Sequence, residues 1–335
     1  MNNQRIVLAS RPAAEPTTAN FRLEEVALAP LDDGQVRVKH HYLSLDPYMR
    51  GRMNDAKSYA QPQPLNETMI GGTVGEVVES RNPKFAVRDK VVGMGGWQQF
   101  STASGKGDIS KVDTTHIPLS AYLGSVGMPG MTAWYGLMKI CEPKAGETVC
   151  VDAASGAVGS VVGQLAKLKG MHVVGIAGGV EKCAYVKNEL GFDDCIDYKA
   201  FPDPKAFYSA LKAVTPRGID CHFENVGGTI MDAVMLRMNA FGRVAMCGMI
   251  SGYNGAPIPM MAPQLILQSR LKFQGFIVSE HMNLWPEGLT ELGGYVASGK
   301  IKFRESIADG LANAPQSFLD LLKGKNFGKQ LVKLV

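Results

Sequence analysis

A strand, a glycine-containing turn and a helix follow one another in residues 147–169, whose sequence is ETVCVDAASGAVGSVVGQLAKLK. The apolar run before ASGAVG (residues 154–159) predicts a buried strand, and apolar residues at helical spacing follow the turn. In this context Gly156 lets the backbone approach a pyrophosphate, and Gly159 lets the helix pack closely against its strand. The N-terminus of the helix then offers N–H groups and a positive dipole end to phosphates. The turn therefore predicts a dinucleotide site, although Ala154 stands where the usual G-x-G-x-x-G pattern has its first glycine.

Strand-like and helix-like runs alternate from this turn to about residue 298. Nearly continuous apolar strands separated by helices predict a parallel sheet that is covered on both faces. Six such strands, with the glycine turn after the first, predict a doubly wound, Rossmann-type α/β domain. The predicted strands are residues 148–153, 172–177, 195–198, 219–225, 243–249 and 271–278. The predicted helices are residues 123–140, 158–169, 180–190, 204–214, 229–238, 262–269 and 286–298.

The first part of the chain has a different pattern. Polar and apolar residues alternate in residues 36–43 and 73–78, and glycine and proline interrupt the chain often. These features predict short antiparallel strands in a barrel-like, β-rich domain. A predicted helix at residues 315–323 and a predicted strand at residues 329–334 return to this style.

Two domains follow from these patterns. We predict a β-rich catalytic or substrate domain at residues 1–126 and 300–335, with the Rossmann-type nucleotide-binding domain inserted at residues 127–299. Two such domains are expected to form a cleft, which is where small-molecule sites are commonly found.

Composition narrows the classes of function. The 335 residues carry a net charge of only +4, spread along the chain, which gives no basis for nucleic-acid binding. No apolar run is long enough to cross a membrane, and the first residues, MNNQRIVLASRPAAEP, lack the apolar stretch of a signal peptide. The six cysteines form no C-x-x-C pair, which indicates free thiols in a reducing compartment. We therefore expect a cytoplasmic protein with a small-molecule ligand.

The end of the second predicted strand indicates which dinucleotide binds. NAD-binding versions place Asp or Glu there to hold the ribose 2′-hydroxyl, whereas this strand runs into GGVEK, residues 178–182. Glu181 comes later, on the predicted helix, so no carboxylate at the strand end repels a 2′-phosphate, and Lys182 can attract one. We predict NADP(H) as the cofactor. The alternative interpretation of Lys182 is a solvated surface lysine.

Further strings resemble a known family. They are LSLDPYMRGRM (43–53), MPGMTAWYGL (128–137), FENVGG (223–228), CGMISGYN (247–254), FQGFIV (273–278) and GKNFGKQLVK (324–333). Together with ASGAVGS they resemble the medium-chain dehydrogenase/reductase superfamily. Within it they are similar to the zinc-independent leukotriene/prostaglandin reductase and alkenal double-bond reductase branch, which includes bacterial curcumin reductases. The resemblance covers essentially the whole chain. It implies a homodimeric, NADPH-dependent reductase that saturates the carbon–carbon double bond of an α,β-unsaturated aldehyde or ketone.

The resemblance also implies site residues. Those implied to contact the cofactor are Thr132, Ser155, Gly156, Ala157, Val158, Gly159, Gly179, Lys182, Tyr198, Asn225, Cys247, Gly248, Ile250, Tyr253, Phe276, Ile277, Val278 and Asn326. Those implied to meet the substrate are Tyr48, Arg50 and Tyr253. The chain departs from the family pattern by carrying Gly-Gly-Val at 178–180, where relatives often have a serine, and by Gly252 before Tyr253.

Hydride addition to an enone places negative charge on the carbonyl oxygen. A hydrogen-bond donor aimed at that oxygen therefore stabilises the transition state, and a tyrosine hydroxyl or the nicotinamide ribose 2′-hydroxyl can supply the bond. Tyr253 follows a predicted strand of the Rossmann sheet, at the edge where ligands bind, so it is the first catalytic candidate and Tyr48 the second. The alternative interpretations are structural: a packing ring for Tyr253, a loop brace for Tyr48 and a local ion pair for Arg50.

No metal is needed for this chemistry, because the nicotinamide carries the hydride. A zinc site needs converging Cys, His or carboxylate ligands. The first 140 residues contain no cysteine, and the Gly-Gly-Thr turn at 71–73 contains no histidine, so we predict no metal. The alternative functions are NADPH quinone reduction, oxidation of a secondary alcohol, and a non-catalytic NADPH-binding role.

Overall fold

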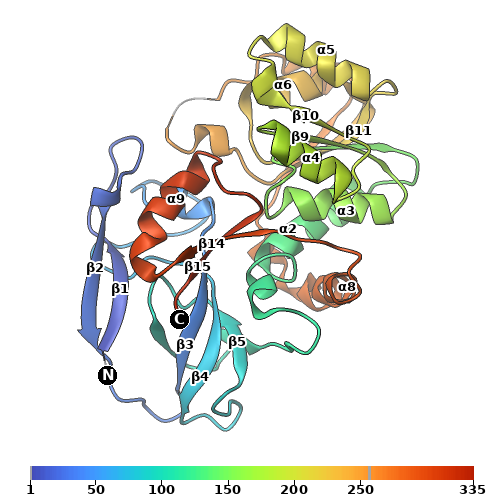
Figure 1. Cartoon of the computed structure of the whole chain (residues 1–335). Helices are drawn as coiled ribbons and strands as arrows, with labels where there is room; N and C mark the ends of the chain where they lie inside the picture. The colour runs from blue at the N-terminus through green and yellow to red at the C-terminus, as the bar shows by residue number, and fades with distance from the viewer. Residues whose placement is uncertain (1, 256–257) are drawn as a thin grey trace. The chain divides into compact units, whose positions relative to one another are not determined.

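The computed structural model describes residues 2–255 and 258–335 (Figure 1). The chain divides into two compact units. The β-rich unit comprises Met1–Leu123 and Glu305–Val335, and the α/β unit comprises Gly124–Arg304. Each unit has a hydrophobic core of its own.

A six-stranded parallel sheet forms the centre of the α/β unit. The strand order is β10-β9-β8-β11-β12-β13, so the first strand in sequence lies inside the sheet and the order reverses between β8 and β11. This is the doubly wound arrangement, which confirms the predicted Rossmann-type fold. The strands are β8 (Thr148–Val151), β9 (His172–Ala177), β10 (Asp194–Asp197), β11 (Ile219–Glu224), β12 (Met238–Met246) and β13 (Lys272–Gly275).

Helices connect successive strands of this sheet, as Figure 1 shows. They are α3 (Gly159–Leu168), α4 (Val180–Asn188), α5 (Pro204–Val214), α6 (Gly228–Met235) and α7 (Gln264–Gln268), and a further helix, α8 (Trp285–Ala297), follows β13. Helix α3 packs against β8 and β9, and α4 packs against β9 and β10. Apolar side chains from strands and helices, such as Ile176, Leu211 and Val244, are buried together, and each contributes roughly 1.5–3 kcal/mol.

The chain enters the α/β unit differently from the predicted continuous helix at 123–140. The structure has a 3-10 helix η2 (Leu119–Leu123), then α2 (Met128–Tyr135), which continues as a π-helix η3 (Gly136–Cys141). Gly127 is extended and Pro129 stands in the first turn of α2, so a helix cannot run through this point.

Strand β12 is also displaced from the predicted residues 243–249. Phe241 adopts a left-handed φ of 64°, yet the strand continues on both sides of it, so β12 begins earlier than its apolar run. At its other end the N–H groups of Cys247 and Gly248 both donate to the Glu224 carbonyl oxygen, at 2.9 and 3.1 Å. These bonds end the regular pairing at Met246.

The β-rich unit contains a seven-stranded sheet and a separate two-stranded sheet. The larger sheet has the order β14-β15-β3-β4-β5-β7, with β6 paired to β3, and the smaller one pairs β1 with β2. The predicted strands at 36–43, 73–78 and 329–334 correspond to β3, β4 and β15. The strands are β1 (Asn2–Leu8), β2 (Phe21–Ala27), β3 (Val36–Ser44), β4 (Thr73–Ser80), β5 (Lys90–Gly93), β6 (Phe100–Ala103), β7 (Ile109–Lys111), β14 (Glu305–Asp309) and β15 (Lys329–Lys333).

Three aromatic rings form the centre of the β-rich core. Phe21 stacks on Trp97 with ring centroids 5.4 Å apart, and Phe318 of α9 (Ala314–Leu322) meets Trp97 edge-on at 5.7 Å. Because these residues come from distant parts of the chain, they join the N-terminal strands to the C-terminal helix within this unit.

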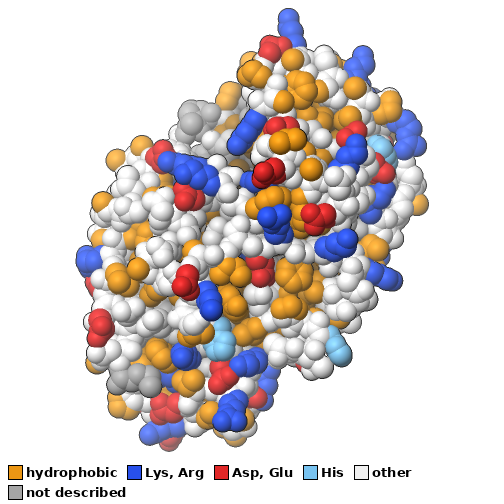
Figure 2. All heavy atoms as spheres, in the orientation of Figure 1, with side chains coloured by type: hydrophobic (Ala, Val, Ile, Leu, Met, Phe, Trp, Pro, Cys, Tyr) orange, Lys and Arg blue, Asp and Glu red, His pale blue; other side chains and the backbone are white. Residues whose placement is uncertain are grey.

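Among residues 2–255 and 258–335, no helix has both the length and the apolar character that crossing a membrane requires. On the face drawn in Figure 2, acidic and basic side chains are interspersed.

Candidate active site

The turn after β8 fits a dinucleotide pyrophosphate. Ala153 adopts a left-handed φ of 43°, and a Cβ on Gly156 would lie 3.1 Å from the Ala153 carbonyl oxygen. A Cβ on Gly159 would lie only 2.5 Å from the same oxygen, which real Cβ atoms do not tolerate. Helix α3 begins at Gly159 and presents the positive end of its dipole to the turn. The small residues therefore allow the strand, the turn and the helix to approach closely.

A loop at the end of β9 lies where the sequence predicts the cofactor 2′-phosphate. A Cβ on Gly178 would lie 2.9 Å from Tyr198 Cε1 and 3.0 Å from Lys199 Cε, so both side chains pack against this loop. Asp197 Oδ1 accepts hydrogen bonds from the backbone N–H of Gly179, at 2.8 Å, and of Lys199, at 3.0 Å. These bonds fasten the loop to the end of β10.

Lys182, in the first turn of α4, is half-buried near Lys199. Burial and the positive charge of Lys199 lower the pKa of Lys182. A phosphate between them would offset this repulsion, whereas a neutral ribose hydroxyl would not. Glu181 is exposed on the helix. The sequence prediction did not include Lys199; its position directly after Tyr198 at the end of a strand was the available signal.

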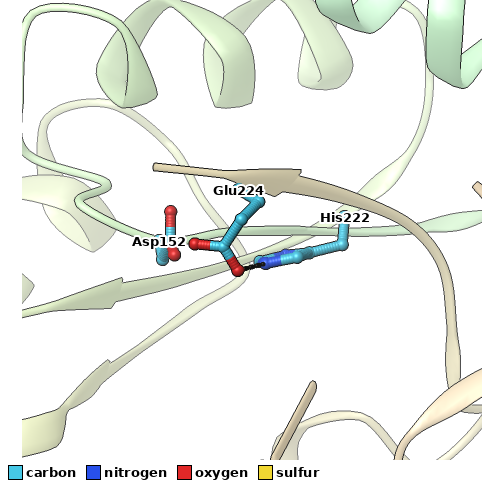
Figure 3. Close-up of side chains that lie close together, drawn as sticks. All are labelled: Asp152, His222 and Glu224. Atoms are coloured by element: carbon cyan, nitrogen blue, oxygen red, sulfur yellow. Dashed lines mark hydrogen bonds and ion pairs between the residues drawn. The ribbon is translucent and has the colours of Figure 1, made fainter. Parts of the chain in front are cut away.

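Three buried ionisable side chains lie where the strand order reverses (Figure 3). Asp152 directly follows β8, Glu224 is the last residue of β11, and His222 precedes it on the same strand. All three are at most 1% exposed. His222 Nε2 lies 3.0 Å from Glu224 Oε2, and His222 Nδ1 lies 3.1 Å from the carbonyl oxygen of Cys150. Sequence reasoning did not identify this group, here called the Asp–Glu–His cluster.

N–H groups surround the two carboxyl groups of the cluster. Glu224 Oε1 accepts hydrogen bonds from the backbone N–H of Val226 and of Gly227, both at 2.6 Å. Asp152 Oδ1 accepts from the backbone N–H of Asn225 at 2.7 Å and from its side-chain Nδ2 at 3.2 Å. The Asn225 Nδ2 also donates to the Asp152 carbonyl oxygen at 3.1 Å. The cluster thus holds Asn225, a predicted cofactor residue, by both its backbone and its side chain.

The two carboxyl groups titrate differently. Burial, together with the neighbouring charge of Glu224, raises the pKa of Asp152 well above its usual range. Burial opposes ionisation of Glu224 as well, but the hydrogen bond and positive charge of His222 outweigh it and lower the pKa of Glu224. Both shifts favour a proton on Asp152 and ionisation of Glu224.

Tyr253 lies at the carboxyl edge of the same sheet. It follows a short 3-10 turn η5 (Ile250–Gly252), whose Ile250 N–H donates to the Asn225 carbonyl oxygen at 3.1 Å. The backbone N–H of Met249 donates to the Tyr253 hydroxyl at 3.4 Å, and a Cβ on Gly248 would lie 3.1 Å from that hydroxyl. The ring therefore folds back over the end of β12 and places its oxygen beside predicted cofactor residues.

Other predicted cofactor residues of the α/β unit make packing contacts. The Thr132 hydroxyl donates to the Met128 carbonyl oxygen of its own helix at 2.8 Å. The Phe276 ring lies 5.4 Å from that of Tyr135, and Val278, two residues further on, is buried. Burial raises the pKa of Cys247 to about 12, which keeps this thiol neutral. Their contacts with the cofactor stay predictions, as do those of the half-buried Ile250 and Ile277.

Tyr48 and Asn326 belong to the β-rich unit. Tyr48 is the first residue of α1 (Tyr48–Arg52), and burial together with the charge of Asp46 raises the pKa of its hydroxyl. The hydroxyl therefore keeps its proton at neutral pH and can donate a hydrogen bond. Asn326 Nδ2 donates to the Gly328 carbonyl oxygen at 2.7 Å, inside its own turn.

Arg50, also in the β-rich unit, is only 2% exposed. Its Nη1 donates to Asn54 Oδ1 and its Nη2 to the Ala14 carbonyl oxygen, both at 2.7 Å. Its guanidinium thus braces two loops of the unit, and its predicted contact with the substrate stays a prediction.

The arrangement of potential metal ligands bears on whether the protein binds a metal ion. Within the described ranges, Asp152, His222 and Glu224 form the one group of at least three potential ligands whose atoms lie within 4.8 Å of one another. Hydrogen bonds from the chain already engage both carboxyl groups and both ring nitrogens. The predicted absence of a metal stays a prediction.

The Rossmann-type sheet, the turn that fits a pyrophosphate and the separate β-rich unit define a dinucleotide-binding oxidoreductase class. Two family models match: the N-terminal domain of oxidoreductase at residues 4–112, and a model described as zinc-binding dehydrogenase at residues 157–293. The chain belongs to the medium-chain dehydrogenase/reductase superfamily, in its prostaglandin reductase and alkenal double-bond reductase branch.

Individual relatives align along nearly the whole chain. The NADPH-dependent curcumin reductase of Escherichia coli (strain K12) is 46% identical over 99% of this chain and 97% of its own. The 2-alkenal reductase (NADP(+)-dependent) of Nicotiana tabacum is 40% identical over 99% of this chain and 97% of its own. The crystal structure of CurA in complex with NADPH from Vibrio vulnificus matches with a TM-score of 0.93 and 46% identity, over 99% of each chain. These matches confirm the resemblance on which the predicted site was based.

Proposed function

We propose that this protein is an NADPH-dependent reductase that saturates the carbon–carbon double bond of α,β-unsaturated aldehydes and ketones. The observation that carries the proposal is the alignment of 99% of the chain with relatives whose names specify NADPH-dependent reduction of curcumin and of 2-alkenals. A 2-alkenal is an α,β-unsaturated aldehyde, so the proposed substrate class includes it. Two lysines, Lys182 of α4 and Lys199 after β10, lie near the loop at the end of β9, and no carboxylate stands at that strand end, which supports NADPH over NADH.

The α/β unit is proposed to bind the cofactor. Residues 155–159 and the start of α3 hold the diphosphate, and Gly179, Lys182, Tyr198 and Lys199 hold the 2′-phosphate. The ribose and nicotinamide are assigned to the remaining predicted residues of this unit, which are Thr132, Asn225, Cys247, Gly248, Ile250, Tyr253, Phe276, Ile277 and Val278. Asn326, which belongs to the β-rich unit, is also a proposed cofactor contact. In domain terms we assign residues 127–299 to NADP binding, and residues 1–126 and 300–335 to the substrate.

Tyr253 is proposed to polarise the substrate carbonyl. When bound, NADPH supplies the hydride. The Tyr253 hydroxyl accepts a hydrogen bond from Met249 N–H, and its own proton is then directed to a carbonyl oxygen on which negative charge develops. Tyr48 is the second candidate donor, because its raised pKa keeps it protonated, and Arg50 is a further candidate for substrate contact.

A homodimer in the cytoplasm is the proposed assembly and location. Strand β13 ends the order of the parallel sheet, and Leu267, just before it, is 80% exposed. A second copy of the chain that pairs along this edge would cover both the free side of β13 and the exposed Leu267 side chain. Light scattering of the purified protein tests this: a dimer that becomes a monomer in Leu267→Asp supports edge pairing, and a monomeric wild type contradicts it.

An NADPH-oxidation assay against a 2-alkenal, an aromatic enone, a benzoquinone and a secondary alcohol (the last with NADP⁺) tests the function. We expect turnover with the first two and NMR of the product to show a saturated carbonyl. A product that retains its double bond and gains an alcohol would contradict the proposal. Turnover of the quinone alone would favour quinone reduction, and NADPH binding without any turnover would favour a non-catalytic role.

A further inference from the structure

We propose that Asp152, Glu224 and His222 form a buried, proton-sharing cluster that positions Asn225 and the loop carrying Tyr253. The inference rests on the proposed function, because it concerns how the residue assigned to the substrate carbonyl is held. None of the three side chains is assigned a direct role in cofactor or substrate binding above. Their role is that of positioning residues.

The contacts fix how many protons the cluster holds. The Cys150 carbonyl oxygen can only accept, so His222 Nδ1, 3.1 Å away, carries a hydrogen. One further proton must lie between His222 Nε2 and Glu224 Oε2, which are 3.0 Å apart. An oxygen of Asp152 lies within 4.8 Å of an oxygen of Glu224 and both side chains are fully buried, so we place another proton between the two carboxyl groups, because two buried negative charges this close would repel each other. Two carboxyl groups and one imidazole therefore hold three protons, and the cluster has no net charge.

The surrounding donors decide where the negative charge lies. Glu224 Oε1 accepts two bonds of 2.6 Å from backbone N–H groups, and its Oε2 faces His222 at 3.0 Å. Asp152 accepts one short bond, of 2.7 Å from Asn225 N–H, and two longer ones of 3.2 Å from Asn225 Nδ2 and Val226 N–H. Donors aimed at a carboxylate favour its ionised form, which agrees with the lowered pKa of Glu224 and the raised pKa of Asp152. We infer that the proton between Glu224 and His222 lies on Nε2, so that Glu224 carries the negative charge and Asp152 keeps a proton. A buried ion pair that is neutral overall and fully hydrogen-bonded avoids the cost of an isolated buried charge.

Two paths of hydrogen bonds connect the cluster to the turn that precedes Tyr253, the proposed catalytic tyrosine. Asp152 holds Asn225, whose carbonyl oxygen accepts from Ile250 N–H at 3.1 Å. Glu224 and Asp152 both hold the Val226 N–H, and the Val226 carbonyl oxygen accepts from Ser251 N–H at 3.1 Å. Ile250 and Ser251 form the turn that ends at Tyr253.

The place of the cluster in the sheet explains why it can act in this way. Asp152 and Glu224 stand at the carboxyl ends of β8 and β11, the two strands between which the order reverses. Ligands of doubly wound sheets bind at this point. A fixed hydrogen-bond network there holds both flanking strand ends and the Tyr253 loop in one arrangement.

The test compares Asp152→Asn with Asp152→Ala. Asparagine can accept from Asn225 and donate to Glu224, as a protonated Asp152 does, and it loses only the 3.2 Å bond from Val226 N–H, whereas alanine loses all of these bonds. We expect Asp152→Asn to keep kcat within about threefold of wild type, and Asp152→Ala to lower kcat by about 10–100-fold because the loop carrying Tyr253 shifts. The dissociation constant for NADPH, measured by nucleotide fluorescence, is expected to change less than kcat, since the phosphate contacts lie elsewhere.

Asp220→Ala is the matched control. Asp220 also bridges β11 and β8, through a 2.8 Å bond from Thr148 N–H, but at the opposite ends of the strands. Its loss is expected to lower stability without the change in kcat. Equal losses of kcat in Asp152→Ala and Asp220→Ala, or an Asp152→Asn variant as impaired as Asp152→Ala, would overturn the proposal.

NMR of the wild-type protein measures the protonation of His222 directly, so this test does not depend on the folding of a variant. The chain has six histidines, so ¹⁵N-histidine NMR can resolve the His222 ring. We expect an imidazolium at pH 7 in wild type and a neutral ring in Glu224→Gln. A neutral His222 in the wild type would overturn the proton assignment. If the wild type reduces no enone, the proposed function fails, while the NMR result still decides whether the cluster shares its protons as described.

Discussion

Tyr253 is the side chain on which the proposed chemistry most depends. Met249 N–H and the absence of a side chain at Gly248 hold its hydroxyl at the end of β12. Tyr48, in the other unit, has a raised pKa and is also able to donate. The two hydroxyls can be separated by single substitutions, because phenylalanine keeps each ring and removes only the donor.

Tyr253→Phe is expected to lower kcat by about 10–10³-fold, as the loss of one donor to a developing oxyanion does. NADPH binding should stay within a few-fold of wild type, because the hydroxyl is not assigned to the phosphates. Steady-state kinetics with a 2-alkenal and fluorescence titration of NADPH provide the two measurements, with Tyr48→Phe as the comparison. A larger loss in Tyr48→Phe than in Tyr253→Phe would transfer the role to Tyr48.

Lys182→Ala and Lys199→Ala are each expected to weaken NADPH binding more than NADH binding, because only NADPH carries the 2′-phosphate. Loss of a charge-assisted contact of this kind corresponds to about 10-fold or more in the dissociation constant. Titration of each variant with both nucleotides gives the ratio. A variant that loses affinity equally for NADPH and NADH would show that its lysine does not recognise the 2′-phosphate.

At the scale of elements, the close approach of β8 and α3 depends on a glycine. Gly159→Ala would place a Cβ 2.5 Å from the Ala153 carbonyl oxygen, so we expect it to lower the free energy of unfolding by about 1–3 kcal/mol and to weaken NADPH binding. Gly294→Ala in α8 is the control, since a Cβ at Gly294 would meet nothing within 4 Å and alanine favours helix. Urea unfolding should show opposite signs for the two variants; equal signs would contradict the close-packing account.

A contact between Glu147, which directly precedes β8, and Arg243 of β12 makes the stability of the α/β unit depend on pH. The Glu147 carboxylate receives bonds from Arg243, at 2.6 and 3.1 Å, and from Lys144 N–H, at 2.8 Å. Burial opposes ionisation, but these bonds outweigh it and lower the pKa of Glu147. The pKa of Glu147 is lower in the folded than in the unfolded state. Its ionised form therefore contributes fully to the free energy of unfolding above the unfolded pKa of roughly 4.3, and this contribution disappears as the pH falls through the folded-state pKa.

Glu147→Gln should therefore lose less stability than wild type when the pH is lowered from about 6 to about 3.5. Urea unfolding at several pH values measures this. Glu287→Gln is the control, because the Glu287 side chain is 60% exposed and forms a surface ion pair with Lys139 at 3.4 Å, which contributes little to stability. If the free energy of unfolding of Glu147→Gln and of the wild type changed with pH in the same way, Glu147 would not be the group that makes stability depend on pH in this range.

For the whole molecule, the family model described as zinc-binding dehydrogenase makes metal content a decisive measurement. We expect substoichiometric zinc in the purified protein and unchanged enone reduction after incubation with a chelator, because the proposed chemistry takes its electrophilic assistance from a tyrosine. Elemental analysis and an activity assay with and without chelator check this. Stoichiometric zinc, or activity lost to the chelator and restored by zinc, would contradict it.

The sequence alone was sufficient for features that depend on local pattern. The glycine turn, the alternation of strands and helices from residue 147, and the missing carboxylate after β9 are all contained in short segments, and the Rossmann-type sheet follows from them. The boundaries were less well predicted where a contact elsewhere overrides the local pattern. Thus β12 ends because two N–H groups turn to Glu224, and the helix before β8 is interrupted at Gly127.

Only the tertiary structure could bring together residues that local patterns treat as unrelated. Asp152 and Glu224 are separated in sequence by the helices α3, α4 and α5 and the strands β9 and β10, and they meet because β8 and β11 are neighbours in the sheet. Lys199 joins Lys182 because β10 lies beside β9. Apolar alternation indicates which residues form a strand but not which strand it pairs with, since that choice is made by packing across the entire sheet. The sequence thus determined the class of protein and its cofactor turn, and the folded sheet decided which charged side chains stand beside them.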